Sequence, residues 1–143
     1  MATLLLIFAS GCNYRSNERL QVLAESGDAE AQLPVAKMYA FGEEVPKNDS
    51  IAVKWYRKAA EQGDAKAQYN LGVMYGNGEG VLPDIGKAYV WFDLAAYNGY
   101  ERGAEAKNIA GKQMTNEQIR KAQYLSEACI AKDYKGCYIE VIF

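Results

Sequence analysis

The sequence lacks the side chain that most often acts in acid–base catalysis. Histidine, the commonest general base and metal ligand, is absent from all 143 residues, so the usual nucleophile–histidine–carboxylate triads are unavailable. The Gly-rich stretch GNGEG at 76–80 lacks the Lys-Ser/Thr pair of a phosphate-binding loop, and no Ser-x-x-Lys motif of penicillin-binding enzymes is present. We therefore predict that the chain is not an enzyme and holds no metal or cofactor.

The charged side chains favour a solvated surface over a reaction centre. Carboxylates that could be imagined as catalytic pairs are spread through the N-terminal third, at Glu18, Glu25, Glu30, Glu43 and Glu44. The formal net charge is −2 with a pI near 5.2, and Lys and Arg are distributed rather than clustered. A nucleic-acid interface needs a basic patch, so we expect no nucleic-acid partner.

The elements that position these side chains come from an internal repeat. A shift of 36 residues superimposes the sequence on itself without a gap. The identical pairs include Gly27/Gly63, Gly63/Gly99, Asp28/Asp64, Gln32/Gln68, Tyr39/Tyr75, Gly42/Gly78, Val45/Val81, Ala52/Ala88, Trp55/Trp91, Ala59/Ala95 and Ala60/Ala96. A period in the thirties is typical of helical repeat arrays. Trp55 and Trp91 could line a ligand cleft, but their equivalent positions favour packing in the core.

Each repeat is predicted to contain two helices. In the second copy Asp64 is placed to cap the first helix, GNGEG ends that helix, and Asp84 starts the second. Apolar residues recur at helical spacing in both segments. A stack of such hairpins is an all-α fold, a right-handed α-solenoid whose open end needs a closing helix with a polar outer face. Thr115 or Asn116 is placed to cap that closing helix.

These features resemble the Sel1-like repeat, a relative of the tetratricopeptide repeat. The segment GDAKAQYNLGVMYGNGEGVLPDIGKAYVWFDLAAYNG from 63 to 99 resembles one unit, and GDAEAQLPVAKMYAFGEEVPKNDSIAVKWYRKAAEQG from 27 to 63 resembles another. The first copy differs at Glu44, which stands where the second has Gly80. We divide the chain into a signal segment (1–11), a linker and half-repeat helix (12–26), two repeats (27–62 and 63–98), and a degenerate third-repeat helix with a capping helix (100–143).

The resemblance implies an interaction module that binds a peptide or protein segment on a concave surface lined by the first helix of each unit. Carried over by position, the ligand-facing residues are Glu30, Leu33 and Lys37 in the first repeat, and Lys66, Tyr69, Val73 and Asn77 in the second. Burial of Leu33 and Val73 is an alternative. Two other functions stay open: a cysteine-rich Sel1-type hydrolase similar to a β-lactamase, and a structural accessory protein of the envelope or of a secretion system.

The N-terminal residues MATLLLIFASGC resemble a bacterial lipoprotein signal. Its apolar run is too short to cross a bilayer as a helix. The string ending at Cys12 resembles a lipobox, in which the cysteine is lipidated and becomes the first mature residue. No Lys or Arg precedes the apolar run, and Ala9 stands where Leu is commonest. We expect a periplasmic protein anchored to the outer membrane through Cys12, and no other membrane contact; the alternative is an apolar N-terminus that packs on the fold.

Two further cysteines remain if Cys12 carries lipid. Cys129 and Cys137 are eight residues apart, and a turn near Gly136 could bring them together. Related repeat proteins from export compartments pair cysteines at this spacing, so the resemblance implies a disulfide. The alternative is a pair of reduced thiols in a cytosolic protein. Two thiols without histidine are a poor zinc ligand set.

Overall fold

The structure, a computed structural model, describes residues 16–135 and residue 137. The proposed signal segment and the lipidation site Cys12 lie outside these residues. The described part begins with helical residues 16–25, and the helices that follow are α2 (Ala29–Phe41), α3 (Asp49–Glu61), α4 (Ala65–Asn77), α5 (Ile85–Tyr97), α6 (Glu101–Gly111) and α7 (Asn116–Ala131). No strand occurs in this part of the chain, as the all-α prediction requires.

Each helix of the two repeats begins at a side chain that accepts a backbone hydrogen bond from three residues ahead. These capping residues are Asp28, Asn48, Asp64 and Asp84. The predicted caps at Asp64 and Asp84 are therefore confirmed. Helices α2 and α4 both end in the left-handed conformation, at Gly42 with φ 70° and at Gly78 with φ 72°. Glycine adopts this conformation without steric cost, which explains why both copies of the repeat place it there.

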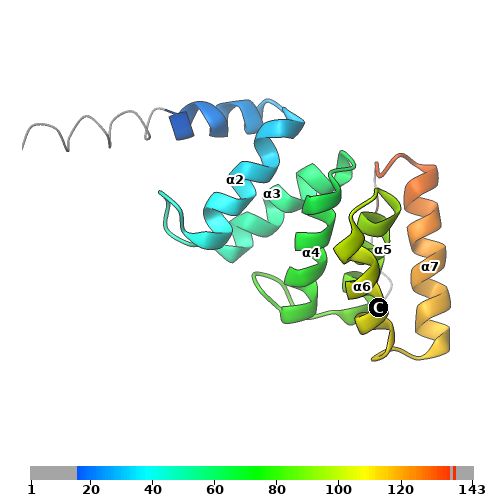
Figure 1. Cartoon of the computed structure of the whole chain (residues 1–143). Coiled ribbons are helices and arrows are strands. Elements are labelled where there is room, and N and C mark those ends of the chain that lie inside the picture. Colours follow the sequence, from blue (N-terminus) through cyan, green and yellow to red (C-terminus); the bar gives the residue numbers. More distant parts are fainter. Residues whose placement is uncertain (1–15, 136, 138–143) are drawn as a thin grey trace, which may run out of the picture.

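The helices stack as consecutive hairpins (Figure 1). Helix α2 packs on α3, α3 on α4, α4 on α5, and α5 on both α6 and α7. Gly72 on α4 allows one close approach, because a side-chain carbon there would meet the Phe92 ring on α5. A continuous apolar core runs from Ala36 to Cys129 through these layers. The predicted solenoid of helical hairpins is confirmed.

The two tryptophans differ in burial although they occupy equivalent repeat positions. Trp91 is only 2% exposed, so the prediction of core packing is confirmed for it. Trp55 is half-buried at the edge of the core, and the prediction holds for it only in part. Lys58, three residues further along α3, places its Nζ 4.3 Å from the centroid of the Trp55 ring. The exposed part of the indole is thus covered by a cation of its own helix.

A ladder of side-chain amides joins consecutive units. The buried Gln68 donates to a carbonyl oxygen of α3 at 3.1 Å and accepts a hydrogen bond from Asn98 at 2.9 Å. In the preceding unit Gln32 donates to a carbonyl oxygen of the 16–25 helix at 3.3 Å and accepts from Gln62 at 2.7 Å. A buried amide left without partners costs about 1–3 kcal/mol. The ladder therefore favours one register between neighbouring hairpins.

Helices α6 and α7 form the third unit and close the array. Thr115 caps α7 with a reciprocal capping box: its hydroxyl accepts from the Gln118 amide N–H, and the Gln118 side chain accepts from the Thr115 N–H. Of the two caps left open by the sequence, Thr115 is the one used. Ala122 and Leu125 bury the inner face of α7 against the core. Among the described helices, none combines the length and apolar character that crossing a bilayer needs.

Beyond α7 the chain turns back toward the second repeat. Cys129 and Cys137 are paired as a disulfide, with Cα atoms 5.3 Å apart. The segment between them contains Asp133 and Tyr134, both with positive φ. The disulfide therefore closes a short loop that holds Tyr134 beside the stack.

Candidate binding surface on the first-helix face

The first-helix face is the surface formed by outward residues of α2, α4 and α6, the first helix of each unit. The site residues predicted from the sequence all lie on α2 and α4. Glu30, Lys66 and Asn77 are exposed, whereas Leu33, Lys37, Tyr69 and Val73 are half-buried. The face thus exposes charged and amide side chains to solvent, and its apolar side chains are partly buried.

Tyr69 is the centre of an aromatic group between the second and third units. Its ring centroid lies 5.1 Å from that of Tyr100, in an edge-on arrangement, and 5.6 Å from that of Phe92. The guanidinium carbon of Arg102 lies 5.1 Å from the centroid of the Tyr69 ring. The electrostatic interaction with Tyr69 has the largest effect on Arg102 and raises its pKa above the usual value. A hydrogen bond and an electrostatic interaction with Tyr100 raise this pKa further. A permanent positive charge therefore stands over an aromatic surface on this face.

A cavity of about 370 Å³ opens next to this aromatic group. Its lining residues are Leu33, Asp64, Ala65, Lys66, Asn98, Gly99 and Tyr100. Leu33 belongs to α2, Lys66 to α4, and Tyr100 directly precedes α6, so three successive units contribute to it. Its volume lies near the lower end of the range for ligand sites. The cavity combines an aliphatic side chain, an aromatic ring and an amino group within one opening.

The structure brings some of the predicted residues together and separates others. Leu33 and Lys66 line the same cavity, and Tyr69 adjoins it through its contact with Tyr100. Val73 packs against the core instead, and Asn77 donates a hydrogen bond of 3.0 Å to Glu79 in the loop after α4. Glu30 and Lys37 are not among the cavity's lining residues. The predicted residues that lie at or beside the cavity are therefore Leu33, Lys66 and Tyr69, all in the N-terminal halves of α2 and α4.

Tyr100 and Arg102 were not among the residues predicted from the sequence. Arg102 is 36 residues beyond Lys66, so one more shift of the predicted binding positions by the repeat period selects it. Tyr100 is 36 residues beyond Asp64, which is a capping position, so the repeat period does not mark it as a binding residue. The third unit departs from the repeat pattern further along, where Gly111 replaces the tyrosine of the earlier units.

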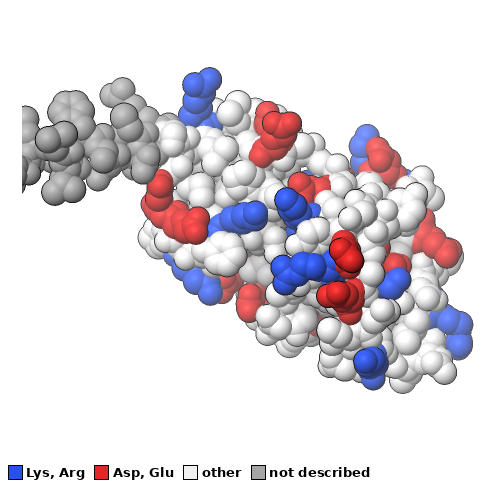
Figure 2. Space-filling view, viewed as in Figure 1, with Lys and Arg blue, Asp and Glu red and all other residues white. Residues whose placement is uncertain are grey.

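The charged side chains of the described surface are mixed in sign and form no metal-ligand group. No three His, Cys, Asp or Glu side chains among the described residues are grouped so as to hold a metal ion. Figure 2 shows basic and acidic side chains interspersed over the face in view, without an extended area of one sign. Stacked helical hairpins of this kind define a helical-repeat protein.

Comparisons with known proteins give the family. The family model described as Sel1 repeat matches residues 29–64 and 65–100. A solved structure of c5321, a protective antigen of uropathogenic Escherichia coli with an SLR fold, is 36% identical with a TM-score of 0.79, over 85% of this chain and 26% of that one. A Sel1 repeat protein from Oxalobacter formigenes is 30% identical with a TM-score of 0.62, over 81% of this chain and 50% of that one. No curated protein matches.

The two matched repeats together span half of the chain, which therefore belongs to the Sel1 repeat family. The chain spans about a quarter of the first similar structure and half of the second. Sel1 repeats generally mediate protein–protein interaction, and the family is typically a non-catalytic scaffold.

Proposed function

We propose that the protein is a non-catalytic adaptor that binds an extended segment of another protein on its first-helix face. The observation that carries the proposal is the placement of Arg102 over the Tyr69 ring, beside a cavity that three units build together. The peptide would lie across the N-terminal halves of α4 and α6, where the exposed cations stand.

The lining chemistry suggests what the segment contains. A carboxylate would pair with the exposed Lys66 or Arg102 in a charge-assisted hydrogen bond. An apolar side chain would enter the cavity between Leu33 and Tyr100. Arginine is preorganised for such contacts because its planar group is held against an aromatic face.

A display experiment tests the peptide-binding proposal. Peptides selected from a random library on the immobilised protein would be synthesised, and their Kd measured by fluorescence anisotropy. Arg102→Glu is expected to weaken binding at least tenfold, because it reverses the charge over Tyr69. Arg120→Glu is the matched control, since Arg120 is also exposed but lies on α7. Equal affinities for both variants and the native protein would refute binding at this face.

The cellular setting is a separate part of the proposal. We propose that the mature protein is held at the periplasmic side of the outer membrane by lipid on Cys12, on the strength of the lipobox-like residues 9–12. Globomycin, which blocks the lipoprotein signal peptidase, should then cause the precursor to accumulate. Normal maturation in the presence of the drug would contradict lipidation at Cys12.

A further inference from the structure

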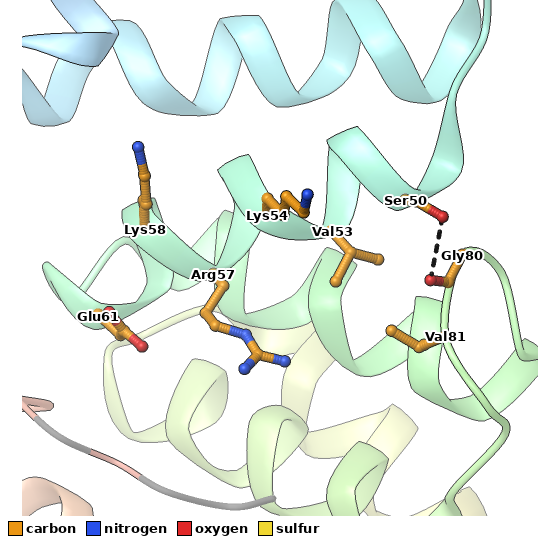
Figure 3. A pocket seen from close by; sticks show the side chains of 8 residues that line it. All are labelled: Ser50, Val53, Lys54, Arg57, Lys58, Glu61, Gly80 and Val81. Carbon is orange, nitrogen blue, oxygen red and sulfur yellow. Dashed lines mark hydrogen bonds between the residues drawn. The ribbon is translucent and has the colours of Figure 1, made fainter.

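A second and larger cavity lies on α3, at the junction between the first and second repeats. Its volume is about 480 Å³, and it is lined by Ser50, Val53, Lys54, Arg57, Lys58 and Glu61 of α3 and by Gly80 and Val81 of the α4–α5 loop. We call it the α3 pocket. Figure 3 shows Val53 directed toward Val81, with the Ser50 hydroxyl hydrogen-bonded to the Gly80 carbonyl oxygen at 3.4 Å. That bond joins the two walls of the pocket.

The pocket has a positive rim around an apolar floor. Three of its lining side chains are cationic and one, Glu61, is acidic, although the chain as a whole carries a net charge of −2. Arg57 is positioned by a 2.5 Å hydrogen bond to the Tyr75 hydroxyl of the second repeat. Lys58 lies over the Trp55 ring, and Lys54 is exposed. These contacts gather positive charge at one place on an otherwise mixed surface.

Two of the equivalent positions in the second repeat are apolar and buried. Lys54 and Lys58 correspond, 36 residues later, to Val90 and Leu94, which are both 0% exposed. Helix α5 packs against α4, α6 and α7, whereas α3 packs against α2 and α4. The first repeat thus carries cations at positions where the second uses buried aliphatic residues. The exposed face of α3 in the first repeat is therefore charged.

We propose that the α3 pocket is a second docking surface, which binds an acidic segment of a partner protein. An apolar side chain of that segment rests on Val53 and Val81, and flanking carboxylates pair with Lys54 and Lys58. Charge complementarity selects the occupant, since three of the four charged side chains that line the pocket are cationic and attract carboxylates. The apolar floor distinguishes a peptide from a free anion, which has no group to place on it. The adaptor then contacts two partners, one on each face.

Two synthetic heptapeptides test the proposal. Both carry a central leucine, flanked on each side by three glutamates in one and by three glutamines in the other. Each is titrated into the ¹⁵N-labelled full chain, and Kd is taken from the amide shifts of α3 and of the α4–α5 loop. The double variant Lys54→Glu/Lys58→Glu is compared with Lys112→Glu/Lys132→Glu, which makes the same charge change at two exposed positions at the ends of α6 and α7. Inorganic phosphate is titrated as a third probe, and circular dichroism checks that each variant is folded.

The glutamate peptide is expected to shift the α3 resonances saturably. Its Kd should rise at least tenfold in Lys54→Glu/Lys58→Glu, stay within twofold in the control variant, and be at least tenfold lower than that of the glutamine peptide. Absence of saturable shifts, equal binding of the glutamine peptide, or an equal loss in both variants would overturn the proposal. Phosphate that displaces the glutamate peptide at a similar concentration would overturn the role of the apolar floor. The result is independent of Arg102, so it stands or fails separately from binding at the first-helix face.

Discussion

The hydroxyl of Tyr134 donates a hydrogen bond of 2.7 Å to Oδ1 of Asn98, one repeat period of 36 residues earlier in the chain. Asn98 in turn donates to Gln68. Tyr134 therefore occupies the position that Asn98 and Gln62 hold in the preceding units, and it ends the amide ladder. Its ring also packs on Gly63, where an added side-chain carbon would lie 3.2 Å away. The loop after α7 thus reaches back to both ends of the second repeat and completes the stack.

Replacing Tyr134 with phenylalanine should destabilise the fold modestly. Tyr134→Phe removes the hydrogen bond to Asn98 while keeping the ring, so the free energy of unfolding is expected to fall by about 1 kcal/mol. Urea denaturation followed by circular dichroism measures this loss. Tyr124→Phe serves as the control, because Tyr124 is 70% exposed on α7. Equal stability of the two variants would mean that the ladder does not need its final member.

Breaking the Cys129–Cys137 disulfide should have a larger effect. The bond joins residues eight apart, and in the chain-entropy model a loop of this size contributes on the order of 2–3 kcal/mol. The expected result is a lower urea midpoint for Cys129→Ala/Cys137→Ala, and for the native protein in dithiothreitol. Because the loop holds Tyr134, the cost of Tyr134→Phe should shrink once the disulfide is absent. A midpoint that dithiothreitol leaves unchanged would contradict this role of the loop.

Replacing Gly80 with alanine should destabilise the protein more than the same replacement at Gly99, a glycine of similar conformation. Gly80 has φ 69° and Gly99 has φ 85°, so alanine is strained at both positions. A side-chain carbon at Gly80 would also collide with the backbone of α3 at Asp49 and Ser50, whereas nothing lies within 4 Å of one at Gly99. Gly80→Ala is therefore expected to cost at least about 1 kcal/mol more than Gly99→Ala in thermal or urea unfolding. An equal loss in the free energy of unfolding for the two variants would show that the α4–α5 loop does not pack closely against α3.

Glu44→Gly should stabilise the protein. Glu44 has φ 64°, in the left-handed region where the second repeat has Gly80 at φ 69°. Relief of this strain, about 1–2 kcal/mol, is partly offset by the greater unfolded-state entropy of glycine. We expect a net gain of about 0.5–1 kcal/mol in the free energy of unfolding. Glu43→Gly, at the neighbouring exposed residue without positive φ, should give no gain, and a gain of similar size there would count against backbone strain as the cause.

The sequence by itself determined the repeat and the limits of its helices. The 36-residue period, the caps at Asp64 and Asp84, and the Gly-rich helix ends are all visible without coordinates. These features are local: a capping carboxylate or hydroxyl bonds to an amide three residues away, and an apolar stripe reflects the pitch of one helix. Contacts between residues close together in the chain can therefore be predicted from the sequence alone.

Tertiary structure alone decided which side chains meet across the units. It placed Arg102 over Tyr69, left Trp55 half-buried while covering Trp91, and kept the charged face of α3 open. Trp55 and Trp91 are the same residue at equivalent repeat positions, yet their environments differ. How much of each is covered depends on the spacing of neighbouring hairpins, which the summed packing of α2 to α7 sets and no single repeat contains.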